Sequence, residues 1–175
     1  MHHARRILLH ILTATALCTF HAALAETAEA QSVSHGGGDF GLGLIIGDPT
    51  GINGKYFLSP EIAIDGSLGF SFIGRDHIQL NADFLWHFGI QRWSAVSLDL
   101  YLGVGPILGI VDHDDRRGRN YGDGGLWIGA RGPFGASLSF NSVPIDIFLE
   151  IAAALWLVQD VDLDLDAAVG VRYWF

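Results

Sequence analysis

The stretch Ile78–His87, IQLNADFLWH, alternates between apolar and polar residues, with Leu85 as the one apolar residue in the polar phase. Successive side chains of a β-strand point to opposite faces, so this stretch predicts a strand with one apolar and one polar face. The apolar face carries Leu80, Phe84 and Trp86, and the polar face carries Asp83. A carboxylate therefore stands in the middle of a strand whose other face is bulky and apolar.

The same alternation occurs in seven further stretches, which are 39–47, 51–58, 61–72, 98–108, 125–140, 145–151 and 167–175. In the stretch 125–140 we expect a kink at Gly132-Pro133, because proline cannot donate to the hydrogen-bond ladder of a sheet. The charged residues of these strands keep to one phase, and they are Lys55, Asp65, Asp83, Asp99, Arg131, Asp146, Glu150 and Arg172. The sequence therefore predicts an all-β fold of eight strands.

The phase of the charges decides which face points outward. The apolar phase is the bulky one, whereas the other phase is small, polar and charged. An eight-stranded barrel has room inside for side chains and little else. A sheet that crosses a lipid bilayer must be closed, because lipid cannot form hydrogen bonds with the backbone of an open edge. We therefore predict an eight-stranded antiparallel up-and-down transmembrane β-barrel, with apolar side chains toward lipid and charged ones in a narrow lumen.

Buried charges are tolerated when they are paired and hydrogen-bonded. We expect the lumen cations to neutralise the lumen carboxylates in a network that plugs the barrel. Its members are Lys55, Asp65, Asp83, Asp99, Arg131, Glu150 and Arg172. A water-filled polar lumen with loose pairing is the alternative.

The first 25 residues have the features of a secretory signal peptide. Arg5 and Arg6 precede an uncharged apolar run, and Ala23-Leu24-Ala25 supplies a small-x-small cleavage pattern. An N-terminal membrane anchor is the alternative interpretation. The predicted organisation is a signal peptide over 1–25, an N-terminal arm over 26–38 and an outer-membrane barrel over 39–175.

Aromatic residues gather near the predicted strand ends, as they do at a membrane–water interface. They are Phe70, Phe72, Trp86, Phe88, Trp93, Trp156, Tyr173 and Phe175. The alternating last strand with its terminal aromatic resembles the C-terminal signature of outer-membrane barrels. That resemblance implies that Tyr173 and Phe175 form a membrane-insertion signal for the barrel-insertion machinery. Aromatic residues in the core of a soluble protein are the alternative.

Several short blocks together resemble a family of uncharacterised small bacterial outer-membrane proteins, a domain of unknown function. The blocks are GDPTG at 47–51 with Lys55, GARGPFG at 129–135, FLE at 148–150 and GVRYWF at 170–175. The resemblance implies an eight-stranded barrel like the transmembrane domains of OmpA and OmpX. It implies no activity.

Candidate catalytic and metal-binding residues lie mostly in polar loops. Histidines that could act in catalysis are His35, His77, His87 and His113, but neither Gly-x-Ser-x-Gly nor His-Glu-x-x-His occurs. Four aspartates on one face of the last hairpin, Asp160, Asp162, Asp164 and Asp166, could bind a divalent cation or extend the barrel into solvent. We predict no enzymatic activity, no cofactor and no metal.

The function predicted is therefore a structural or surface-interaction role in the outer membrane. The longest connection, 109–124, would face outside, where it could meet an extracellular partner. A narrow channel for a small solute and a soluble periplasmic lipocalin-like binder are alternatives, and the second requires an apolar lumen. A net charge of −9 opposes binding to nucleic acid.

Overall fold

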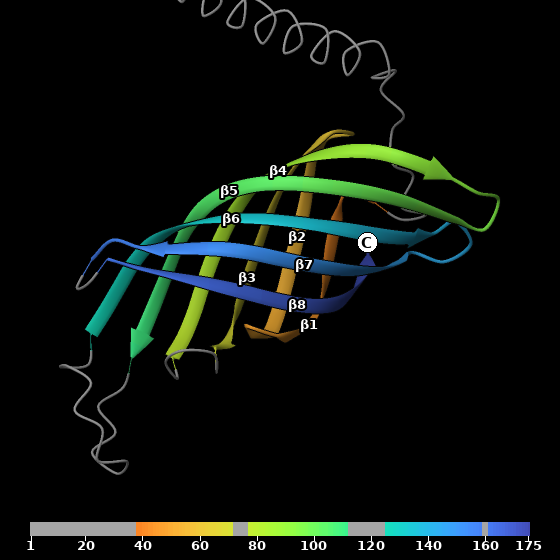
Figure 1. Ribbon diagram of the computed structural model, residues 1–175. Helices are drawn as coiled ribbons and strands as arrows, with labels where there is room; N and C mark the ends of the chain where they lie inside the picture. Colours follow the sequence, from red (N-terminus) through yellow and green to blue (C-terminus); the bar gives the residue numbers. More distant parts are fainter. Residues whose placement is uncertain (1–37, 72–76, 112–124, 159–160) are drawn as a thin grey trace, which may run out of the picture. The chain divides into compact units, whose positions relative to one another are not determined.

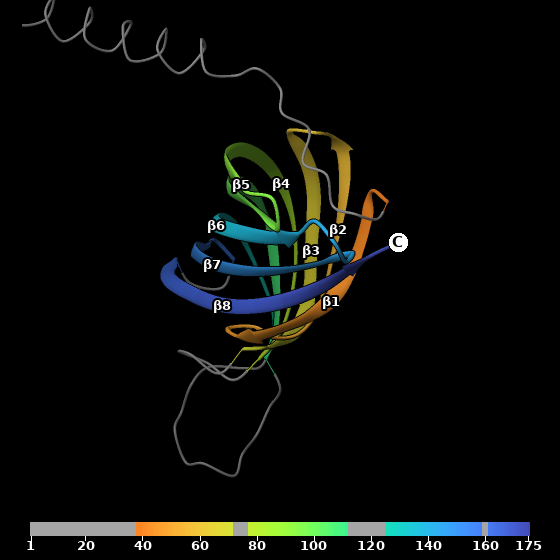
Figure 2. The ribbon, with the colours of Figure 1, turned by 90° about the vertical axis from the view of Figure 1, so that its right-hand side faces the viewer.

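A computed structural model describes residues 38–71, 77–111, 125–158 and 161–175. The described residues form eight strands, which are β1 (Phe40–Gly47), β2 (Thr50–Ser59), β3 (Ile62–Ser71), β4 (His77–Arg92), β5 (Val96–Val111), β6 (Gly125–Phe140), β7 (Ile145–Trp156) and β8 (Asp162–Trp174). Each strand pairs antiparallel with the next, and β1 pairs with β8, so the sheet closes on itself (Figure 1). Figure 2 shows β1 between β2 and β8, where the closure occurs. The predicted all-β fold, an eight-stranded antiparallel up-and-down barrel, is confirmed.

Residues 1–37 lie outside the described part of the chain. The predicted signal peptide and nearly all of the predicted N-terminal arm therefore stay predictions. The barrel begins at Phe40 and its last strand ends at Trp174.

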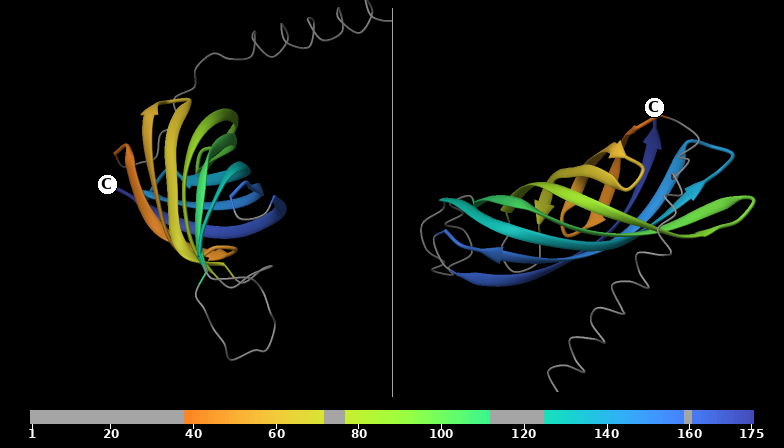
Figure 3. Two further views of the ribbon diagram at one scale, coloured as in Figure 1. Left: turned by 90° about the vertical axis from the view of Figure 1, so that its left-hand side faces the viewer. Right: turned by 90° about the horizontal axis from the view of Figure 1, so that it is seen from above.

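Four of the strands, β4, β5, β7 and β8, run further than the alternation indicated. β4 continues to Arg92 and β5 begins at Val96, whereas the regular alternation in the sequence stops at His87 and resumes at Leu98. The β4–β5 register shifts between Gly89 and Gln91, and this irregularity breaks the period of two that marks a strand in the sequence. The right-hand view of Figure 3 shows the resulting long hairpin in green.

The β4–β5 turn is tied to the neighbouring β6–β7 turn by Asn141. Its side-chain amide donates to the carbonyl oxygens of Trp93 at 2.9 Å and Ser94 at 3.2 Å. The backbone N–H of Asn141 also donates to the carbonyl of Ala95. One side chain thereby holds two turns at the end of the barrel where the chain terminates.

Strand β6 crosses Gly132-Pro133 without ending. Its pairs with β7 run in one register from Gly129 to Ser139, and the predicted kink does not interrupt that ladder. On the β5 side the pairs pause after Leu102–Phe134 and resume at Gly105–Arg131 in the same register. The side chain of Pro133 points into the barrel. Because proline has no backbone N–H, the hydrogen-bond ladder is interrupted locally between β5 and β6, while the ladder between β6 and β7 is continuous.

The outer face is apolar and the inner face holds the charges, as predicted. Leu80, Ile147 and Val171 point outward and are between 43% and 46% exposed. The interior also contains large aromatic side chains. Trp156 is only 3% exposed, so its predicted place in an outer aromatic belt is wrong.

Candidate functional site

The charged interior is the candidate site, and strands β2 to β8 each contribute one of its predicted residues. All seven side chains point inward and are at most 5% exposed. In strand order they are Lys55, Asp65, Asp83, Asp99, Arg131, Glu150 and Arg172. Because side chains alternate along each strand, the one-phase placement of charge in the sequence delivers all of them to one enclosed space.

Arg131 of β6 is the centre of a first cluster. Its Nη1 lies 2.6 Å from a carboxylate oxygen of Asp83, and its Nη2 lies 2.6 Å from one of Glu150. Nε lies 3.7 Å from Asp166. Tyr101 donates its hydroxyl proton to the second oxygen of Glu150 at 2.9 Å. Three carboxylates therefore converge on one guanidinium.

Neutral side chains support the carboxylates of this cluster. Asn81 donates to Asp83 at 2.7 Å, and Gln79 donates to Asp166 at 3.3 Å. Ser67 in turn donates to the amide oxygen of Asn81. The hydrogen bonds thus extend from β3 across β4 and β6 to β7 and β8, which joins strands that are not neighbours in the sheet.

Arg172 of β8 is the centre of a second cluster. It contacts Asp146 through Nε at 3.0 Å and through Nη2 at 2.8 Å, a two-pronged arrangement that matches the planar guanidinium to the carboxylate. Its Nη1 donates to Asp65 at 2.8 Å and to Asn53 at 3.1 Å. The guanidinium carbon also lies 4.0 Å from the ring centre of Phe148.

The carboxylates of the second cluster have further donors. Asn53 donates to Asp65 at 2.7 Å, and Ser137 donates to Asp146 at 2.7 Å. Each of these two carboxylates therefore bonds both to Arg172 and to a neutral donor on a further strand. A fully hydrogen-bonded network of this kind makes a protein interior rigid.

Sequence reasoning missed two members of these clusters. Asp146 shares the inward phase, but the predicted network omitted it. Asp166 was grouped with the aspartates of the last hairpin, although it is 6% exposed and belongs to the Arg131 cluster. Its even-numbered position on β8, in phase with Arg172, was the signal that could have found it.

Lys55 takes a different role from the one expected. Its Nζ has no hydrogen-bond partner among the described residues. It lies 4.3 Å from the ring centre of Tyr101 and 5.6 Å from that of Phe57. The ammonium is thus stabilised by an aromatic face rather than by a carboxylate contact. Asp99 is buried in the same interior, outside the two arginine clusters.

Aromatic and apolar side chains pack on both sides of the charged layer. Toward the chain terminus they are Phe57, Ala63, Leu85, Tyr101 and Trp174. Toward the opposite end they are Ile107, Ala154 and Trp156, with Trp127 against them. The strand registers place the two arginine clusters between these groups.

Three of the candidate catalytic and metal residues contact aromatic side chains. His77 packs edge-on against Trp156 at 5.6 Å, and His87 lies 4.9 Å from the ring of Phe57. Asp164 accepts a hydrogen bond from Nε1 of Trp156 at 2.9 Å. His35, His113, Asp160 and the loop residues 112–124 lie outside the described residues.

Within the described ranges, no group of three or more His, Cys, Asp or Glu side chains has the arrangement needed to hold a metal ion. A helix long and apolar enough to span a membrane is likewise absent from the residues that the structure describes.

The two residues of the predicted insertion signal lie on the outer face. Tyr173 is 48% exposed and Phe175 is 64% exposed. Their rings contact each other at 5.0 Å, and Phe175 also stacks on Phe40 at 6.1 Å. Three aromatic rings therefore lie together beside the β8–β1 pairing, at the end of the chain.

The closed antiparallel sheet, with an apolar outside and a charged inside, defines an eight-stranded β-barrel fold. Among solved structures the chain is similar to the N-terminal β-barrel domain of OprF from Pseudomonas aeruginosa. The two share 17% sequence identity with a TM-score of 0.56, over 78% of this chain and 98% of that domain. No family model and no curated protein matches the chain, so the resemblance to an uncharacterised family stays a prediction.

Proposed function

We propose that the chain is an outer-membrane β-barrel protein whose role is structural or surface-interacting, with its lumen plugged by the two arginine clusters. The observation that carries this proposal is the inversion of polarity. Exposed Leu, Ile, Val and Phe cover the outside, while nineteen polar or charged residues are buried within the described part of the chain. A water-soluble barrel would have the opposite arrangement.

Burial energetics support a lipid environment. Removing one large aliphatic side chain from water is worth about 1.5–3 kcal/mol. The outer face carries such residues on every strand, so the total for the barrel is tens of kcal/mol. An exposed apolar surface of that extent is far beyond what soluble monomers carry. The soluble lipocalin-like alternative needs an apolar lumen, which the buried carboxylates oppose.

The contacts inside favour a plug over an open channel. Arg131 spans β4, β6, β7 and β8 through its three carboxylates, and Arg172 spans β3, β7 and β8. Large aromatic side chains lie on both sides of these clusters. An eight-stranded barrel has little interior space beyond such side chains.

The proposal is tested by membrane association and by conductance. The protein is expected to float with phospholipid vesicles, to resist alkaline extraction and to migrate faster on a gel before heating than after. In planar bilayers it is expected to give no steady single-channel openings. Recovery in the soluble periplasmic fraction without detergent would contradict the membrane assignment, and steady openings would favour the narrow-channel alternative.

Export through the predicted signal peptide and recognition by the barrel-insertion machinery belong to the same proposal. Deleting residues 1–25 is expected to leave the protein inside the cell. Replacing Tyr173 and Phe175 by alanine is expected to lower the amount of folded barrel in the membrane. The loop within 109–124 is the proposed contact for an extracellular partner, and a loop-shortened variant should keep its folded, heat-modifiable form while it loses that contact.

A further inference from the structure

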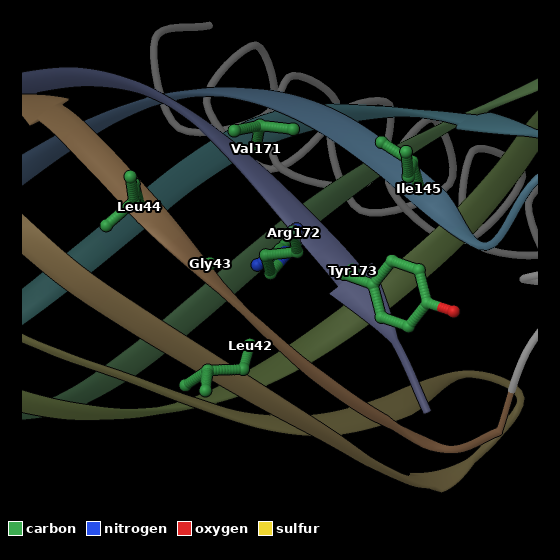
Figure 4. Close-up of a pocket in the computed structure, with 7 residues that line it drawn as sticks. All are labelled: Leu42, Gly43, Leu44, Ile145, Val171, Arg172 and Tyr173. Atoms are coloured by element: carbon green, nitrogen blue, oxygen red, sulfur yellow. The ribbon is translucent and has the colours of Figure 1, made fainter.

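The outer wall has a groove at the seam where β8 meets β1. Its volume is about 230 Å³, and it is lined by Leu42, Gly43, Leu44, Ile145, Val171, Arg172 and Tyr173. Figure 4 shows Leu42 and Leu44 of β1 on one side, Val171 and Tyr173 of β8 on the other, and Gly43 with Arg172 between them. Gly43 and Arg172 are register partners, so paired backbone forms the floor.

Gly43 alternates with Leu42 and Leu44, so it belongs to the inward phase of β1 together with its register partner Arg172, and only its backbone reaches the groove. A Cβ built there would come within 1.9 Å of the carbonyl oxygen of Val171 and 2.7 Å of Cα of Arg172. The two strands therefore approach each other more closely than a side chain at position 43 permits. Arg172 is 1% exposed and directs its guanidinium into the barrel, away from the groove.

The lining favours an apolar ligand over a polar one. Apart from the Tyr173 hydroxyl, no polar side-chain group is available, because the Arg172 guanidinium is fully engaged inside. The lining is confined to seven residues of β1, β7 and β8. The volume is also below the roughly 300–1,000 Å³ of pockets that enclose a whole small molecule. A linear hydrocarbon segment fits these limits.

The position of Tyr173 indicates which end of the groove lies nearest the lipid headgroups. Its phenolic oxygen points away from the other lining side chains (Figure 4). Tyr173, Phe175 and Phe40 form the aromatic group at this end, and such groups sit at the level of lipid headgroups. The hydroxyl is therefore placed at the headgroup level, with the aliphatic walls extending toward the hydrocarbon.

We propose that this groove holds an acyl chain of one phospholipid from the leaflet on the side of the chain terminus, with the headgroup next to Tyr173. The inference rests on the proposed membrane location and adds a defined lipid site to it. The bound lipid covers the β8–β1 seam, where β1 contributes only eight residues to barrel closure.

The test compares variants that fill the groove with a matched neighbour. Val171 lines the groove, whereas Val169 lies two residues away on the same strand and face, and both are 45% exposed. The wild type, V171F, L44F and V169F are inserted into nanodiscs of phosphatidylethanolamine and phosphatidylglycerol. They are then released into detergent, and retained phospholipids are counted by native mass spectrometry. The wild type and V169F are expected to retain one phospholipid that V171F and L44F lose.

Other outcomes overturn the inference. Equal retention by all four proteins, or none by the wild type, contradicts the site while leaving the membrane assignment intact. Retention of a second protein copy that V171F abolishes would assign the groove to self-association instead, and displacement of the phospholipid by added lipid A would assign it to the other leaflet. Heat-modifiable mobility verifies that each variant is folded, and L44F serves if V171F does not fold. A wild type that fails to enter any bilayer would instead refute the proposed function.

Discussion

Removal of the Arg172 guanidinium is expected to be among the most damaging single changes in the barrel. In R172M, Asp65 and Asp146 lose the cation that lies 2.8 Å from each of them. Asn53 and Ser137 still donate to these acids, but neither supplies a positive charge. Breaking a buried ion pair by deleting one partner costs about 3–5 kcal/mol, and we expect R172M to lose stability in that range.

The assay is reversible urea unfolding in phospholipid vesicles, followed by tryptophan fluorescence and by gel mobility without heating. The triple variant R172M/D65N/D146N is the control, because it removes both uncompensated charges together with the cation. It is expected to recover most of the lost stability, since replacing a whole buried ion cluster with neutral groups is often close to neutral. A loss below about 1 kcal/mol in R172M, the value of an exposed ion pair, would refute the idea that the clusters are enclosed. A triple variant as unstable as R172M would instead show that the loss comes from packing against Phe148 rather than from charge.

Further predictions concern the remaining layers of the barrel. In E150A, Arg131 and Tyr101 each lose a partner at 2.6 Å and 2.9 Å, so resistance of the folded form to heating in detergent should fall; unchanged heat resistance would count against a network. K55M should change the free energy of unfolding by no more than about 2 kcal/mol, because the ammonium contacts an aromatic ring rather than a carboxylate. A larger loss would show that Lys55 is stabilised by an anion as well. G135A should be destabilised, since its Cβ would come within 2.3 Å of Tyr101, whereas G132A should be tolerated because its nearest neighbour is 3.9 Å away; equal stability of the two in urea titrations would contradict the close packing of Tyr101. L80K, on the outer face, should lose about 2–4 kcal/mol in vesicles if it lies near the bilayer midplane, and no loss would argue against a lipid-facing position.

The alternation of residue types was sufficient to predict the fold. In a strand the side-chain direction depends only on position parity, so the inward placement of Asp83, Glu150 and Arg172 follows from sequence alone. The same local rule failed where the inward residues are themselves apolar. The inward side chains at the end of β7 are Ala154 and Trp156, so polarity no longer marks the phase there, and the strand was ended too early.

Partner choice inside the barrel could not be predicted in the same way. Arg172 binds Asp65, which is 107 positions away, and Arg131 binds Asp83, which is 48 positions away. Such pairs depend on the stagger between strands and on which side chains face each other across the closed interior. Lys55 was expected to pair with an acid, yet the register carries its ammonium onto the face of Tyr101.

The sequence by itself determined that the chain makes strands, that their apolar side faces outward and that ionised groups are enclosed. These properties arise from a period of two and from the cost of leaving a charge in an apolar medium, and both act locally along the chain. Only the tertiary structure decided that three acids gather around Arg131, that Arg172 grips Asp146 with two nitrogens and that a groove opens beside Gly43. Those features require barrel closure, because side chains from strands distant in the sheet meet only when the wall curves around them.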